Sequence, residues 1–109
     1  MLGKIKEKFG GSRQKTVADL TDAMTKGLDL PSVYKPEVIH KSSGRVASGQ
    51  KHVDLQEIDY AALGTIGELK SEIERLYADD DLSVRITSPT DKDGVSERMH
   101  LKTLREAAD

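Results

Sequence analysis

The stretch that decides the fold is Thr65–Thr87, with the sequence TIGELKSEIERLYADDDLSVRIT. In its first half, large apolar residues recur every three or four positions, which is the spacing of one helix face. Thr65 and Glu68 have the spacing of a capping box, in which each side chain accepts a hydrogen bond from the backbone N–H of the other residue. The sequence therefore predicts an amphipathic helix over residues 65–78, with an apolar face formed by Ile66, Leu69, Ile73 and Leu76.

Strands are predicted on both sides of this helix. Residues 82–87 alternate between apolar and polar, which is typical of a strand with one buried face. A turn follows, and apolar residues return on alternate positions over residues 95–101; residues 52–55 alternate in a similar way. Two short apolar pieces on either side of Pro36 suit the edge of a sheet. We expect an α+β fold, in which a mostly antiparallel sheet of three to four strands packs on the helix.

A short amphipathic helix is predicted at the N-terminus, over residues 2–9. Leu2, Ile5 and Phe9 lie on one face of it, and lysines lie around the rest of the circumference. The pair Gly10-Gly11 ends this helix, because glycine lowers helix stability.

A second short helix is predicted from Thr16 onward. Thr16 and Asp19 have the spacing of another capping box, and we expect Gly27 to be the left-handed residue that ends the helix. These patterns divide the chain into a helical N-terminal segment (1–30), an extended loop or arm (31–51) and a compact β-α-β-β domain (52–109).

The composition predicts a thin core. The 109 residues are 36% hydrophobic and 33% charged, and only 4% are aromatic. A chain of this size buries roughly two-thirds of its unfolded surface, and a glycine- and serine-rich stretch in the arm adds little to that burial. We therefore expect the chain to associate, either with copies of itself or within a larger protein complex.

Charge is distributed unevenly along the chain. Residues 1–50 contain nine Lys and Arg against five Asp and Glu, whereas residues 51–109 contain eight against fourteen. A basic first half attracts the phosphates of lipids or nucleic acids. The same asymmetry also permits attraction between the two halves or between copies of the chain, and both interpretations stay open.

Several classes of chemistry lack their usual residues. The chain has no cysteine, which excludes disulfides, thiolate nucleophiles and zinc sites built on cysteine. His40, His52 and His100 do not have the spacing of metal ligands, and the sequence contains no P-loop, no G-x-S-x-G and no G-x-G-x-x-G. We therefore predict a protein that is not an enzyme, with no catalytic residue, no cofactor, no metal site and no small-molecule substrate. The run Asp79–Asp81 indicates either a solvated turn or a site for a cation or a basic partner.

Three sets of residues are predicted to make contacts. The first, for a membrane or a partner, is Leu2, Lys4, Ile5, Lys8 and Phe9. The second, on the arm, is Lys41, Arg45 and Lys51. The third, as an interface between copies, is Val84, Ile86, Met99 and Leu101.

The leading hypothesis is a small binding or assembly protein that acts through protein–protein contacts, as an oligomer or as a subunit of a larger complex, including one of virion type. One alternative is a regulator that binds membrane surfaces reversibly through helix 2–9. Another is an accessory protein that binds nucleic acid through the basic first half. No apolar run has the length of a membrane span or of a secretory signal, so a cytoplasmic protein or a virion component is expected.

Two families share parts of these patterns. The helix that begins Thr65-Ile66 and the later Thr103-Leu104 turn resemble ubiquitin-like β-grasp domains, a resemblance that does not imply conjugation chemistry. The order of a short N-terminal amphipathic segment, a second helix, Leu69-Lys70-x-x-Ile73 and two strands resembles the MinE family of cell-division topology factors. The second resemblance implies reversible membrane contact through the N-terminus and dimerisation through the sheet.

Overall fold

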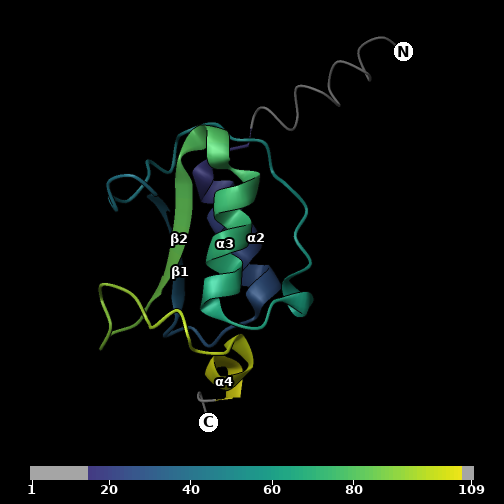
Figure 1. Ribbon diagram of the computed structural model, residues 1–109, viewed down its shortest axis with the longest axis vertical. Coiled ribbons are helices and arrows are strands. Elements are labelled where there is room, and N and C mark those ends of the chain that lie inside the picture. The colour runs from purple at the N-terminus through teal and green to yellow at the C-terminus, as the bar shows by residue number, and fades with distance from the viewer. Residues whose placement is uncertain (1–14, 107–109) are drawn as a thin grey trace.

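The computed structural model describes residues 15–106. In chain order its elements are α2 (Val17–Leu28), β1 (Lys35–His40), the 3-10 helix η1 (Tyr60–Ala62), α3 (Ile66–Leu76), the 3-10 helix η2 (Ala78–Asp80), β2 (Leu82–Thr87) and α4 (Leu101–Glu106). β1 and β2 form an antiparallel ribbon with a register that runs from Lys35 opposite Thr87 to His40 opposite Leu82. α2 packs on β1 and α3 packs on β2, while α4 lies at the opposite end of the molecule from the start of α2 (Figure 1).

The α+β class is confirmed, but the prediction of three to four strands is wrong, because the sheet of the described residues has two. Residues 95–101 do alternate between apolar and polar, yet they form no repeated backbone pairing with a strand. The carbonyls of Met99 and Glu97 accept hydrogen bonds from the N–H groups of Ile66 and Gly67, 3.0 and 2.9 Å long. These N–H groups belong to the first turn of α3 and have no partner within the helix. The segment therefore wraps around the start of α3, and α4 begins at Leu101.

The strand expected at residues 52–55 makes a single bridge, in which His52 pairs with Thr16. Val46, which lies in the expected arm, also makes a single bridge, with Ile39 after a turn. One bridge fixes one residue pair, whereas a strand repeats the pairing over several residues. β1 itself lies inside the segment that was expected to be an extended arm.

α2 forms where the second N-terminal helix was predicted, and the predicted helix 2–9 lies outside the described residues. The capping box is present: Asp19 accepts a 2.9 Å hydrogen bond from the Thr16 N–H, and Thr16 accepts from the Asp19 N–H. The hydrogen bonds from Thr16 lower the pKa of Asp19 below its ordinary value. The expected role of Gly27 is wrong, because the left-handed residue after the helix is Asp29, with φ 52°.

α3 has the predicted capping box as well. The Thr65 hydroxyl accepts from the Glu68 N–H at 3.1 Å, and the Glu68 carboxylate accepts from the N–H groups of Thr65 and Gly64 at 2.8 and 2.7 Å. Three backbone N–H groups at the start of α3 thus donate to two side chains.

We predict that Thr65→Ala lowers the free energy of unfolding by about 1 kcal/mol, the usual effect of losing an N-cap hydroxyl. Thr65→Ser keeps the acceptor oxygen and is the matched control. Urea unfolding of the three proteins measures the difference. A change in Thr65→Ala no larger than in Thr65→Ser would show that the cap contributes nothing measurable.

One core takes side chains from all three predicted segments. Leu20 and Met24 come from the first segment, Val38 from the second and Ile73 from the third. Tyr77 is the largest of the fully buried side chains, and its hydroxyl accepts a 2.9 Å hydrogen bond from the backbone N–H of Gln56. The long stretch between β1 and α3 is thereby fixed to the end of α3.

Candidate functional site

A groove runs between α2 and the free edge of β1, and we call it the α2–β1 groove. It consists of two adjoining hollows of about 460 and 350 Å³. Thr21, Lys35 and Pro36 line both hollows. The first hollow extends to Ala18, Val46 and Gly49, and the second extends to Thr25, Leu30 and Tyr34.

Two features of the sequence create the groove. The apolar stripe of α2 points into the core, so the small residues Ala18, Thr21 and Thr25 on the neighbouring face line the hollows. On the other side, a hairpin after β1 turns at Gly44, with φ 74°, and places Val46 at the rim. Val46 is 56% exposed, which is unusual for a large apolar side chain in the described part of the chain.

The free edge of β1 is a poor place for an added strand. The hairpin already uses part of this edge, because the Val38 carbonyl accepts from the Ala47 N–H at 3.0 Å. Outward-facing backbone groups alternate along an antiparallel strand, so Pro36 faces the same edge as Val38. Pro36 has no N–H to donate to a further strand. The groove is therefore suited to side chains rather than to an extended backbone.

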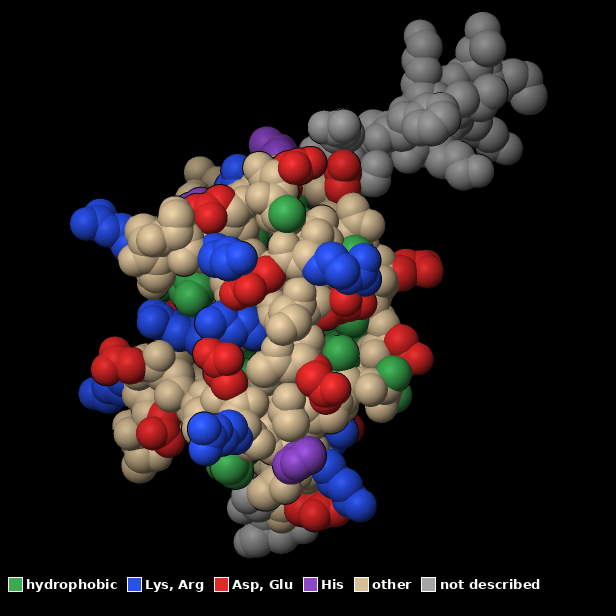
Figure 2. All heavy atoms as spheres, viewed as in Figure 1, with side chains coloured by type: hydrophobic (Ala, Val, Ile, Leu, Met, Phe, Trp, Pro, Cys, Tyr) green, Lys and Arg blue, Asp and Glu red, His purple; other side chains and the backbone are tan. Residues whose placement is uncertain are grey.

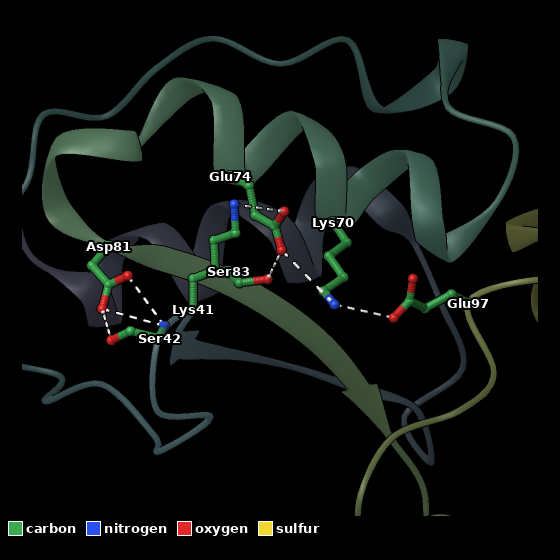
Figure 3. A network of polar contacts seen from close by, with 7 residues as sticks. All are labelled: Lys41, Ser42, Lys70, Glu74, Asp81, Ser83 and Glu97. Carbon is green, nitrogen blue, oxygen red and sulfur yellow. Dashed lines mark hydrogen bonds and ion pairs between the residues drawn. The ribbon is translucent and has the colours of Figure 1, made fainter.

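A row of charged side chains from α3 and from the segments around residues 41 and 97 lies beside β2 (Figure 3). The Glu74 carboxylate accepts a 2.7 Å hydrogen bond from the buried Ser83 hydroxyl and lies 3.7 and 3.8 Å from the Lys41 and Lys70 ammonium groups. The Lys70 ammonium also lies 3.1 Å from the Glu97 carboxylate. Two positive and two negative charges balance one another, so the network offers no unpaired charge to a ligand.

This network protects the open edge of β2. The Val95 N–H donates to the Ile86 carbonyl at 2.7 Å, so the segment after the last turn borders that edge. A third hollow, of about 310 Å³, lies between α3 and this segment, and the ion pair of Lys70 with Glu97 joins its two walls. Charged side chains at a sheet edge disfavour the addition of another strand.

The predicted arm residues are held by their own chain. Lys41 pairs with Glu74, and Lys51 lies 3.6 Å from the Asp80 carboxylate. Arg45 is exposed, and its backbone carbonyl accepts from the His40 N–H at 2.8 Å. Two of the three basic side chains thus already have acidic partners.

The residues predicted as an interface between copies lie mainly in the core. Val84, Ile86 and Leu101 are fully buried, and Met99 is partly buried. The first three therefore present no surface to a second copy. The contact residues predicted at the N-terminus, Leu2, Lys4, Ile5, Lys8 and Phe9, lie outside the described residues.

The aspartate run after α3 is a turn with internal partners. Asp81 has φ 56°, and its carboxylate accepts a 2.6 Å hydrogen bond from the Ser42 hydroxyl. Asp80 pairs with Lys51. Between residues 15 and 106, no three His, Asp or Glu side chains come together as a metal site would require.

The groove carries few charges. Glu37 is paired with Arg85 at 2.6 Å. Asp22 and Lys35 form no ion pair with another described residue, and they contribute one charge of each sign to the first hollow. On the face that carries α3, positive and negative side chains are interspersed (Figure 2). That face has no continuous basic patch of the kind that binds nucleic acid.

The pKa shifts of two tyrosines have structural causes. Burial raises the pKa of Tyr77, and the hydrogen bond from Gln56 opposes that effect. Burial also raises the pKa of Tyr60, whose ring packs on α2. Neither hydroxyl lines the α2–β1 groove.

Sequence reasoning missed the groove. The available signal is the spacing of Ala18, Thr21 and Thr25, which places small residues on one strip of α2 next to its apolar stripe. What this strip faces depends on the position of β1 and of the hairpin after it. The sequence predicts an extended loop or arm for both of these segments.

No protein-family model, curated protein or solved structure matches this chain. No family match supports either of the two resemblances. Among residues 15–106, no helix has both the length and the apolar character needed to cross a bilayer.

Proposed function

We propose that this chain is a non-enzymatic binding protein, and that its α2–β1 groove takes the apolar face of a helix from a protein partner. The observation that carries the proposal is the pair of adjoining hollows, lined largely by apolar and small side chains, beside a strand edge where Pro36 offers no N–H. Proteins that bind amphipathic helices use such grooves and anchor side chains spaced at i, i+3, i+4 and i+7.

The dimensions of the groove support a helix as the ligand. The groove follows α2 from Ala18 to Thr25, which is about 10 Å at 1.5 Å per residue. That length matches two turns of a bound helix, which present three or four anchors. Val46 at the rim supplies exposed apolar area that a bound helix would cover.

The proposal is tested with a displayed library of helix-forming peptides that are randomised on one face. We expect selection on the full chain to enrich apolar residues at i, i+3 and i+7. Thr25→Arg places a long charged side chain in the second hollow, and we expect it to weaken the selected peptides about tenfold or more, the effect of losing one central contact.

Ser71→Arg is the matched control, because Ser71 is exposed on α3 and lines none of the three hollows. Binding by the control should equal that of the unmodified chain. Selected peptides that bind Thr25→Arg as tightly as Ser71→Arg would place the binding surface elsewhere and overturn the proposal.

A further inference from the structure

The two walls of the α2–β1 groove carry charges of opposite sign. Asp22 follows Thr21 on α2, and Lys35 is the first residue of β1; both are exposed and line the first hollow. Lys35 also lines the second hollow. A ligand that lies between α2 and β1 therefore has a negative charge on one side and a positive charge on the other.

Both charges are available to a ligand. In the described part of the chain, Asp22 forms no ion pair, although Lys26 stands one turn further along α2. Lys35 forms none with a described residue either. Glu37 is the remaining charged residue among those described that line the two hollows, and its carboxylate is held by Arg85.

A helix bound in the groove presents its two flanks to these charges. Its apolar face meets the floor of the groove, so the positions on either side of that face lie against α2 and against β1. In coiled coils the corresponding flanking positions carry charges that set the choice and the orientation of the partner helix. Opposite charges favour one arrangement of an interface, and like charges disfavour the other.

Reversing the direction of a bound helix exchanges its flanks. Apolar anchors at i, i+3, i+4 and i+7 keep the same pattern when a helix is turned end for end, so the anchors alone do not define its direction. The flank that lay against Asp22 then lies against Lys35. Unlike charges on the two walls therefore distinguish the two directions, which like charges could not do.

We propose that Asp22 and Lys35 select a partner helix with basic residues along one flank of its apolar face and acidic residues along the other, and that they fix its direction in the groove. The basic flank lies against Asp22 on α2, and the acidic flank lies against Lys35 on β1. This inference rests on the proposed function, since it names the charge pattern and the direction of the helix that the groove takes.

The test uses two helical peptides of identical composition, both with leucine anchors at i, i+3, i+4 and i+7. The first has lysine at i+1 and i+8, which lie on one flank, and glutamate at i−1 and i+6, which lie on the other flank. The second has these charges exchanged. Each peptide carries a nitroxide at its N-terminus and is added to the full chain, in which the methyl groups of Ala18 and Thr25 mark the two hollows.

We expect the two peptides to bind in opposite directions. Ala18 and Thr25 are about 10 Å apart along α2, so the methyl group nearer to the nitroxide should be broadened at least about tenfold more. That methyl group should belong to Ala18 with one peptide and to Thr25 with the other. Asp22→Lys combined with Lys35→Glu should exchange the assignment, and Asp22→Asn combined with Lys35→Gln should make the two peptides behave alike.

Salt provides a second measurement. The side chains of Asp22 and Lys35 are exposed, so their interactions with the peptide are screened by salt, whereas the contacts of the leucine anchors are not. In 1 M salt, where the Debye length is about 3 Å, we expect the difference between the two peptides to fade while both stay bound.

Broadening of the same methyl group by both peptides would overturn the inference, and so would an assignment that the charge reversal leaves unchanged. Either result, together with weaker binding to Thr25→Arg than to Ser71→Arg, contradicts the inference alone. Peptides that bind Thr25→Arg and Ser71→Arg equally contradict the proposed function, and the inference then fails with it.

Discussion

Replacement of Tyr77 by alanine is expected to lower the free energy of unfolding by about 3–5 kcal/mol, the range for deleting a large aromatic side chain from a core. Tyr77 is only 2% exposed and lies at the end of α3, where the chain turns into η2. Its removal leaves a cavity among the core side chains and also leaves the Gln56 N–H without its acceptor.

Tyr77→Phe separates these two effects. The ring stays and only the hydroxyl is lost, so the expected loss is about 1 kcal/mol, the usual net value of one hydrogen bond. Urea unfolding of both variants measures the difference. A loss of under about 1 kcal/mol in Tyr77→Ala would contradict the buried position of the ring.

The same residue predicts how stability changes in alkaline solution. The folded-state pKa of Tyr77 is raised above its ordinary value by burial. Folding therefore favours the neutral phenol, and the stability that this supplies is complete below the ordinary tyrosine pKa and is lost as the pH rises through the folded-state pKa. We expect Tyr77→Phe to lose less stability above pH 10 than the unmodified chain. Since Tyr60 also has a raised pKa, part of the alkaline loss should persist.

Replacement of Gly27 by alanine is expected to destabilise the protein by about 1–3 kcal/mol, the range for overpacking. Alanine is normally better than glycine in a helix by about 1 kcal/mol. Here a Cβ on Gly27 would lie 2.2 Å from Cδ2 of the Tyr60 ring, and real atoms cannot approach so closely. The Tyr60 ring must therefore move away from its position against α2.

A second background tests this explanation directly. In a chain that carries Tyr60→Ala, the obstacle is gone and Gly27→Ala should be stabilising, so the sign of the effect reverses. Thermal unfolding of the four proteins forms a double-mutant cycle. An equal effect of Gly27→Ala in both backgrounds would mean that the Tyr60 ring does not pack on this glycine.

The elements with strong local signals were predictable. Both capping boxes, at Thr16 and at Thr65, form as expected, because the spacing of three residues is enough to define them. The alternation of residues 82–87 also predicts β2 correctly. In each case the information lies within a few neighbouring residues.

The remaining elements depend on contacts that are distant in sequence. Residues 95–101 alternate like a strand, but the unpaired N–H groups at the start of α3 take their carbonyls. Gly27 lies where a helix end is expected from the sequence. Its lack of a side chain instead leaves room for the ring of Tyr60, which is 33 residues further along the chain. Local patterns do not include such partners.

The candidate site was the least predictable part. Its walls come from α2, from β1 and from the hairpin that carries Val46, and no local pattern brings these together. The sequence did mark Leu2, Ile5 and Phe9 as a contact face. These three residues lie outside the described part of the chain.

The most direct test is to map by nuclear magnetic resonance which methyl groups of the full chain shift when a selected helical peptide is added. We expect the methyl groups of Ala18, Thr21 and Thr25 to shift most and to show contacts to apolar side chains of the peptide. Shifts confined to Val95 and the outer edge of β2, with the α2 methyl groups unchanged, would contradict binding of the peptide in the α2–β1 groove.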